Sequence, residues 1–291
     1  MTDDSEATGL DLYDRVARDA AAAVIARYST SFALACRMLG RRVRADVKNV
    51  YALVRIADEI VDGPAVEAGM DVEAARELLD DLETEVHAAI HRRYSTNLIV
   101  HAFAGTAREC GIGDELIGPF FASMRTDLEA TEHDAASHDM YVYGSAEVVG
   151  LMCLQVFVNA GGSAPTAPDP GLVDGARRLG AAFQDVNFLR DRAHDDAALG
   201  RDYLGLRTGR STRADVLDGI DADLAAAAAV IPQLPADCRR AVTAAHDLFH
   251  ELARRLRADP ADDVRVRVPD GVKALLAARA LAGRAPRGVR A

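Results

Sequence analysis

Residues 184–196 read QDVNFLRDRAHDD, and this stretch decides how the rest of the chain is interpreted. On an α-helix, Asn187, Asp191 and Asp195 stand at i, i+4 and i+8, so one amide and two carboxylates share a ridge. Like charges at this spacing cost a helix roughly 0.2–0.5 kcal/mol, and burying them costs more unless a cation lies between them. Because every ligand on the ridge is an oxygen, the expected partner is a hard divalent ion, above all Mg²⁺.

A second acidic pair lies far upstream, in the stretch YALVRIADEIVD at residues 51–62. Asp58 and Asp62 repeat the i, i+4 spacing, and Tyr51 and Arg55 precede them on the same helical face. The two halves of the chain therefore each supply one carboxylate pair. Two such pairs facing each other are expected to hold Mg²⁺ ions whose remaining coordination sites take substrate phosphates.

Composition limits the class of protein. The 291 residues, 49% of them apolar, are enough for a substantial core. A net charge of −11 argues against a nucleic-acid partner and against non-specific attraction to anionic membranes. The acidic N-terminus shows no secretory signal. Four widely spaced cysteines are expected to be reduced core residues of a cytoplasmic protein, with neither a disulfide frame nor a zinc site: Cys36, Cys110, Cys153 and Cys238.

Helical periodicity runs through the chain, and no convincing strand pattern interrupts it. The expected helices cover residues 11–27, a short stretch through 39, 46–62, 71–91, 97–110, 114–129, 138–158, the segment around 184–195, 214–217, 221–231, 236–258 and 272–281. Asp46 is the expected N-cap of the helix that carries Asp58, and Gly63-Pro64 ends that helix. The most apolar run, residues 148–158, is too short to span a bilayer and fits a buried helix. We predict an all-α fold in a single domain, residues 1–291, with flexible ends at 1–10 and 284–291 and a surface loop at 161–174.

Four blocks of the sequence resemble the phytoene/squalene synthase family, the head-to-head prenyl diphosphate synthases, and bacterial phytoene synthases most of all. The blocks are, in order, YSTSF at residues 28–32, residues 51–62, the segment from Tyr141 through Gly150, and residues 184–195. The resemblance spans about Tyr28 to Tyr203. It implies an isoprenoid-synthase helical bundle around a central cavity.

The resemblance also implies roles for individual residues. It assigns the Mg²⁺–diphosphate ligands to Asp58, Asp62, Asn187, Asp191 and Asp195. It assigns diphosphate contacts to Ser29, Ser31, Arg55, Arg190 and, as a weaker match, Arg267, and it places Tyr51, Tyr141 and Gln184 at the reacting centre. The sequence departs from the family pattern at His194, which replaces Glu, at Glu147 and Val148, which replace Gly-Thr, and at Phe249, which replaces Tyr.

The activity that the resemblance implies is an Mg²⁺-dependent condensation of two geranylgeranyl diphosphates to phytoene through a cyclopropylcarbinyl diphosphate, as in carotenoid biosynthesis. Mn²⁺ is the substitute ion, and NADPH is not expected. One alternative is a squalene, presqualene diphosphate or hydroxysqualene synthase that uses farnesyl diphosphate; another is a non-catalytic helical partner that kept the fold. Prenyl chain length, oligomeric state and a loose membrane association for product release stay open.

Overall fold

The computed structural model describes residues 8–61, 63–129, 135–198, 204–206, 209–258 and 266–288, without the side chains at 30–31, 129, 135–137 and 192–198. The α-helices are α1 (Gly9–Tyr28), α2 (Thr30–Met38), α3 (Arg41–Val61), α4 (Pro64–Glu67), α5 (Val72–Arg92), α6 (Leu98–Cys110), α7 (Asp114–Glu129), α8 (Ala135–Val142), α9 (Val148–Asn159), α10 (Pro170–Ala198), α11 (Arg213–Val230), α12 (Ala236–Ala258) and α13 (Asp270–Leu281). Two short segments are the π-helical η1 (Tyr143–Glu147) and the 3₁₀-helical η2 (Ile231–Gln233). Within the described ranges there is no strand, and the all-α prediction is confirmed.

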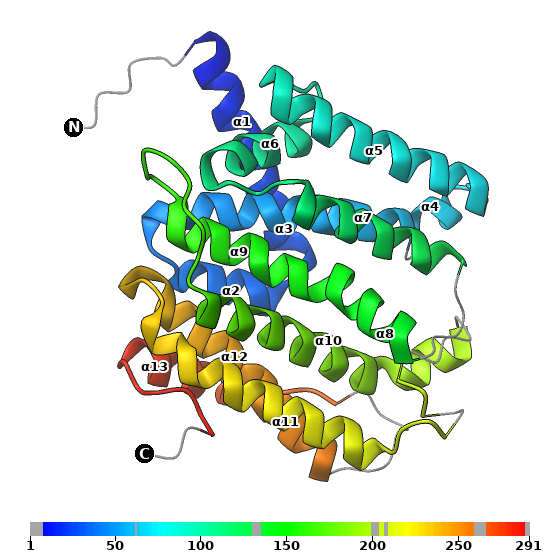
Figure 1. Ribbon diagram of the computed structural model, residues 1–291, viewed down its shortest axis with the longest axis vertical. Helices are drawn as coiled ribbons and strands as arrows, with labels where there is room; N and C mark the ends of the chain where they lie inside the picture. The colour runs from blue at the N-terminus through cyan, green and yellow to red at the C-terminus, as the bar shows by residue number, and fades with distance from the viewer. Residues whose placement is uncertain are drawn as a thin grey trace.

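Five helices lie side by side as one layer (Figure 1). In order across the layer these are α5, α7, α9, α10 and α11, each packed against the next. The helix α3 packs against α1, α6 and α9, and α12 packs against α2, α10 and α11. In α10, Leu172 joins the hydrophobic cluster that contains Phe103 and Phe121, whereas Val186 joins the cluster that contains Ile220. The helix with the QDVNFLRD stretch therefore lies at the junction of two cores.

The helix that carries Asp58, α3, begins at Arg41, so the prediction that Asp46 caps it is wrong. Asp46 lies inside the helix and is buried, and its carboxylate accepts a hydrogen bond from Thr106 Oγ1 of α6 at 2.7 Å. Burial raises the pKa of Asp46, and the bond from Thr106 opposes that rise. A residue type that favours helix caps is tolerated in the interior because a tertiary partner satisfies its carboxylate.

Three other segments differ from the predicted boundaries. The helix α10 begins at Pro170, inside the expected surface loop, and proline suits the first turn of a helix. The helix α11 is continuous through the exposed Gly219, in place of the two helices expected at 214–217 and 221–231. The helix expected at 138–158 is a longer helical run in which η1 separates α8 from α9.

The apolar interior agrees with the sequence prediction. Residues 148–158 form part of a buried helix, in which Val148, Met152 and Val156 are almost completely inaccessible to solvent. The stretch His138–Asn159 is long and apolar enough to cross a membrane by length and composition, but 56% of its most apolar window is buried within the protein, as in a core helix. All four cysteines are free; three are buried and Cys153 is half-buried.

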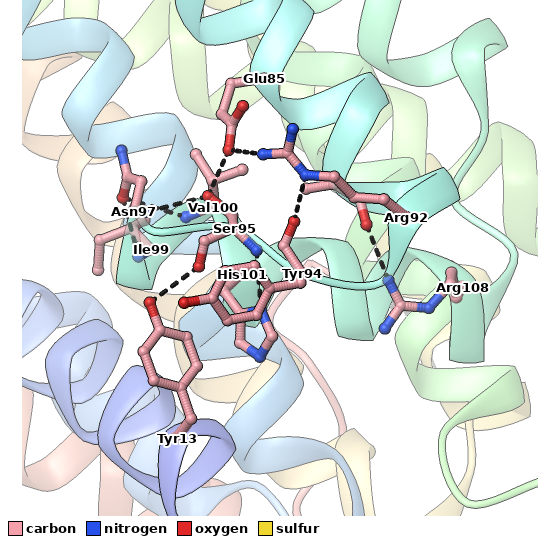
Figure 2. A network of polar contacts seen from close by, with 11 residues as sticks. Tyr13, Glu85, Arg92, Tyr94, Ser95, Asn97, Ile99, Val100, His101 and Arg108 are labelled. Carbon is pink, nitrogen blue, oxygen red and sulfur yellow. Dashed lines mark hydrogen bonds and ion pairs between the residues drawn. The ribbon is translucent and has the colours of Figure 1, made fainter. Parts of the chain in front are cut away.

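A hydrogen-bond network fixes the first half of α1 against the connection between α5 and α6 (Figure 2). The Tyr13 hydroxyl donates to the carbonyl oxygen of Ser95 at 2.8 Å, and the buried Ser95 hydroxyl donates to Glu85 at 2.6 Å. The backbone N–H of Ser95 donates to Nδ1 of His101 at 3.3 Å. Since Nδ1 accepts, the ring proton stands on Nε2, which donates to Asp14 of α1 at 2.7 Å. The bonds of Tyr13 and Asp14 thus fix α1, which packs against α3 and α6.

The two expected flexible ends contain residues with defined positions. The helix α1 already begins at Gly9. Near the other end, the backbone N–H of Arg287 donates to Asp247 Oδ1 at 2.8 Å, and its guanidinium donates to Glu251 Oε2 at 3.2 Å. Because Asp247 and Glu251 are both buried in α12, the segment after α13 is attached to the core of the fold.

The carboxylate of Glu251 predicts a pH dependence of stability. Its side chain is only 4% exposed, and hydrogen bonds from Arg254 and Arg255 hold its pKa down at about 2, against the opposing effect of burial. A carboxyl whose pKa is lower in the folded state than in the unfolded state stabilises the fold at pH values above the ordinary glutamate pKa. This stabilisation is lost as the pH falls toward 2. We expect Glu251→Gln to lower the free energy of unfolding by about 2 kcal/mol at pH 7.

Urea unfolding at a series of pH values between 7 and 3 tests this expectation. The difference between wild type and Glu251→Gln should shrink below about pH 4.5, where the unfolded state takes up the proton. Glu77, exposed on α5, provides the matched control, and Glu77→Gln should leave stability unchanged at every pH. A difference that stays constant over the whole pH range would mean that the charge of Glu251 does not contribute.

Candidate active site

The acidic face predicted at residues 51–62, which we call the first ridge because it comes first in the chain, lies on α3, where Tyr51, Arg55 and Asp58 are half-buried. Burial raises the pKa of Tyr51, whereas the Arg55 guanidinium and a hydrogen bond with Ser29 lower it and Asp58 raises it further. The phenol therefore stays protonated at neutral pH and keeps its O–H donor. Asp62, the second carboxylate of the pair, lies outside the described residues.

Arg55 connects this ridge to the junction between α1 and α2. Its guanidinium lies over the ring of Tyr28, 4.6 Å from the centroid, and forms an ion pair with Glu59 one turn further on. Its Nε is buried and has no hydrogen-bond partner. A buried donor without an acceptor is costly, so this position favours an anion beside Arg55.

Ser29 is the N-cap of α2, and its hydroxyl accepts a hydrogen bond from the backbone N–H of Phe32 at 3.1 Å. Ser29 therefore acts as a helix cap. The backbone amides and dipole of a helix N-terminus also attract anions, so capping is compatible with a neighbouring phosphate. The side chain of Ser31, the other predicted contact, lies outside the described part of the structure.

The ridge of Asn187, Asp191 and Asp195, which we call the second ridge, lies on α10. Gln184 Nε2 donates to Ser145 Oγ of η1 at 3.3 Å, and Asn187 is half-buried further along the helix. Arg190 binds the carboxylate of Asp191 with two hydrogen bonds, of 3.1 and 2.7 Å. Thus Arg190 and Asp191, for which separate roles are predicted, neutralise each other here. The side chains of His194 and Asp195 lie outside the described set.

Tyr141 is buried, and its hydroxyl donates to Asp127 Oδ2 of α7 at 2.9 Å. Its ring lies 6.1 Å from that of Phe188 of α10, so the phenol is held between α7 and α10. Sequence reasoning missed Asp127, because nothing in the spacing of two residues on separate helices indicates that they touch. Asp127 orients the phenol and thereby defines where its ring face points.

Asp185 is a second residue that sequence reasoning missed, although it stands within the QDVNFLRD stretch. Its Oδ1 lies 3.8 Å from Nε2 of His138, and its side chain is 21% exposed. Burial raises the pKa of this carboxyl to about 7, and the charges of Asp223, Asp139 and Glu147 add to the rise. A search for i, i+4 pairs does not find Asp185, because it faces away from Asn187 around the helix.

Four aromatic rings from α2, α3, α10 and α12 form what we call the aromatic wall: Phe32, Tyr51, Phe183 and Phe249. The rings of Phe183 and Phe249 stack at 3.8 Å, and Phe32 lies 6.4 and 6.3 Å from them. Phe32 also lies 6.2 Å from Tyr51, so it stands between the two ridges. Phe249, which departs from the family pattern, contributes an apolar ring here and is buried.

The remaining predicted positions lie elsewhere. Glu147 forms an ion pair with Arg177 of α10 at 2.6 Å, and Val148 is fully buried, so both belong to the contact between η1, α9 and α10. Arg267 is exposed just before α13, and among the described residues no hydrogen bond or ion pair joins it to either ridge.

Comparison with known proteins identifies the family. The sequence profile of the squalene/phytoene synthase family matches residues 25–273. The 15-cis-phytoene synthase of Paracoccus sp. (strain N81106 / MBIC 01143) is 27% identical over 265 residues, which cover 84% of this chain and 83% of the relative. The 4,4'-diapophytoene synthase of Staphylococcus haemolyticus (strain JCSC1435) is 27% identical over 198 residues, or 67% of this chain and 65% of the relative.

A solved structure of a dehydrosqualene synthase in complex with a ligand has the same fold. It superposes with a TM-score of 0.76 at 22% identity, over 94% of this chain and 98% of the other. The isoprenoid-synthase helical fold is therefore confirmed. With the family profile covering most of the sequence, the chain belongs to the squalene/phytoene synthase family and is a prenyltransferase.

Proposed function

We propose that the chain is a cytoplasmic phytoene synthase that joins two geranylgeranyl diphosphates head to head, with Mg²⁺ and without NADPH. The observation that carries the proposal is the position of Phe32 between the two ridges. Its ring centroid lies 6.2 Å from that of Tyr51 on the first ridge. It lies 6.4 Å from that of Phe183, which precedes Gln184 on α10. One site thus combines polar groups for a diphosphate with aromatic surface for a hydrocarbon. The 15-cis-phytoene synthase relative supports this choice of product.

The donor chemistry of the ridges suits Mg²⁺, since Asp58, Asn187 and Asp191 offer oxygen ligands only. Within the described side chains, no three His, Cys, Asp or Glu residues gather as a metal site. The proposed set therefore needs Asp62 and Asp195, one from each ridge. When bound, the ion supplies positive charge that offsets the charge on the departing diphosphate.

The chain's own residues bind the diphosphate and protect the reacting carbon. Arg55 and the N-terminus of α2 would hold the diphosphate as the allylic C–O bond breaks and the diphosphate takes the electron pair. Arg190, by moving from Asp191 to a diphosphate oxygen, would take its positive charge from Asp191 to the diphosphate. The carbocation is attacked by the double bond of the second substrate, and loss of a proton gives the cyclopropylcarbinyl diphosphate. Tyr51 and Tyr141 are suited to stabilise the cations through their ring faces, while the aromatic wall excludes water.

A synthase that uses farnesyl diphosphate is the second candidate. The relative named 4,4'-diapophytoene synthase and the structural neighbour named dehydrosqualene synthase favour it. The two substrates differ by one five-carbon unit, which adds about 4 kcal/mol of burial at roughly 0.8 kcal/mol per carbon. A well-fitted pocket would therefore discriminate strongly between them.

Product identification tests the proposal. Purified protein is incubated with Mg²⁺ and either geranylgeranyl or farnesyl diphosphate, each with and without NADPH, and the hydrocarbon is identified by mass spectrometry. We expect phytoene from geranylgeranyl diphosphate without NADPH. Turnover confined to farnesyl diphosphate would establish the second candidate, whether the product is a hydrocarbon, hydroxysqualene or presqualene diphosphate. The absence of any product from either substrate would support a non-catalytic partner.

A further inference from the structure

A cavity of about 220 Å³ lies between α1 and α3, apart from the two ridges. Its lining residues are Arg18, Asp19 and Ala22 of α1 and Arg41, Arg44, Ala45 and Lys48 of α3. Four cations thus face one carboxylate, in a chain whose net charge is −11. We call this cavity the α1–α3 pocket.

Intramolecular partners account for two of the four cations, since the charge of Arg18 also interacts with the buried carboxylate of Asp46. Arg44 donates from Nε to the carbonyl oxygen of Leu39 at 3.0 Å and thereby caps the end of α2. Within the described residues, no carboxylate lies within ion-pair distance of Arg18, Arg41 or Lys48. Exposed arginines often point into water alone, but here three cations without a direct ion pair converge on one cavity from two helices. Their mutual repulsion destabilises the fold unless an anion is bound.

The backbone of α3 adds to this positive potential. Arg41 and Arg44 stand in the first turn, where the helix dipole is positive, and the first turn contains no acidic residue. Cations at a helix N-terminus are unfavourable by roughly 0.3–1 kcal/mol each, so this placement costs stability without an anionic partner. The hydrogen bond from Tyr13 to Ser95 ties α1, which carries Arg18, to the α5–α6 connection (Figure 2), and α1 packs against α3.

We infer that the α1–α3 pocket is a binding site for a phosphate-bearing anion, separate from the diphosphate site proposed between the two ridges. The volume lies below the roughly 300–1,000 Å³ of pockets that enclose a drug-sized ligand. Apart from Ala22 and Ala45 every lining residue carries a charge, which favours an anionic group over a prenyl chain. The site therefore takes the anionic group alone: a free diphosphate, or the headgroup of an anionic lipid.

The pocket continues along the same face of α3 as the first ridge. Lys48, Tyr51, Arg55 and Asp58 follow one another at spacings of three and four residues. Lys48 and Arg55 are two turns apart, about 10 Å along the helix axis. An anion bound in the pocket would stand at the start of this face, where local positive charge overcomes the repulsion that the acidic protein exerts on anionic ligands.

Calorimetric titration with inorganic diphosphate in EDTA tests the site independently of Mg²⁺ and of catalysis. We expect wild type to bind, and Arg18→Gln/Lys48→Gln to bind at least about tenfold more weakly, because two charge-assisted contacts are lost. Arg240→Gln, at an exposed arginine of α12, is the matched control and should bind like wild type. Since Arg18 and Lys48 make no ion pairs in the described structure, Arg18→Gln/Lys48→Gln should unfold at the wild-type temperature or slightly above it, because two mutually repelling charges are removed, and Arg240→Gln should unfold at the wild-type temperature.

Arg55→Gln separates this site from the ridges, because it removes a proposed diphosphate contact while leaving the pocket intact. Binding that survives in Arg55→Gln but not in Arg18→Gln/Lys48→Gln supports the inference. Loss only in Arg55→Gln, or equal affinity in wild type and the double variant, overturns it.

A second arm of the test compares vesicles of phosphatidylglycerol with vesicles of phosphatidylcholine. Co-sedimentation of the protein with phosphatidylglycerol that the double variant abolishes identifies a lipid headgroup as the ligand. If neither inorganic diphosphate nor the vesicles bind, the inference is overturned.

Discussion

Asp58→Asn is expected to lower kcat/KM at least about 100-fold, the largest effect on activity that we predict. The amide keeps the size of the side chain but removes the negative charge that would hold the ion against the leaving diphosphate. A loss of this size corresponds to about 2.7 kcal/mol of transition-state stabilisation. Steady-state assays with the substrate identified by product analysis measure it. Asp174→Asn, at an exposed carboxylate on α10, is the matched control and should retain wild-type activity.

Thermal unfolding of the same variants distinguishes a catalytic carboxylate from a structural one. Asp58→Asn should lose its activity while it stays folded at the assay temperature, because the amide keeps the size of the side chain and its capacity for hydrogen bonds. Asp191→Asn weakens the charge-assisted hydrogen bonds from Arg190, so it should lose some stability as well as activity. If Asp58→Asn unfolded at a lower temperature and kept its activity, the first ridge would be structural.

The helices and the two ridges could be predicted because their signals are local. Asp71 and Asn97 cap α5 and α6 with side-chain hydrogen bonds, as expected for these residue types in front of an apolar helical pattern. Spacings of four and three residues likewise placed Tyr51, Arg55 and Asp58 on one half-buried face of α3. Caps and faces depend on residues within a few positions of one another, so a single sequence contains them.

The features that could not be predicted depend on contacts between distant segments. Asp46 has the residue type of a cap and lies inside a helix, because Thr106 of α6 satisfies it. Asp127 reaches the hydroxyl of Tyr141 across two helices, and the exposed Gly219 interrupts the sequence pattern without interrupting α11. Local propensity does not decide such positions, since tertiary packing overrides it.

The contact between α10 and η1 depends on Gly180. A Cβ atom built at Gly180 would stand 2.7 Å from the carbonyl oxygen of Ala146 and 3.0 Å from the Cα of Glu147. Both atoms belong to the backbone of η1, so neither can move aside as a flexible side chain would. A π-helical segment is uncommon and often marks a functional site, and η1 also supplies Ser145, which binds Gln184 one turn after Gly180.

We therefore expect Gly180→Ala to lower the free energy of unfolding by about 3 kcal/mol, the upper end for an overpacked core contact. Because the added methyl group pushes α10 away from η1, activity should also fall, by about 10-fold or more, as the second ridge shifts relative to Tyr141. Gly219→Ala on α11 is the matched control: nothing lies within 4 Å of its Cβ position, so the same change should stabilise the protein by about 0.5–1 kcal/mol. Urea unfolding of both variants measures the two effects. Changes of the same sign and size in both would show that helix propensity, and not the close approach of two backbones, determines the role of Gly180.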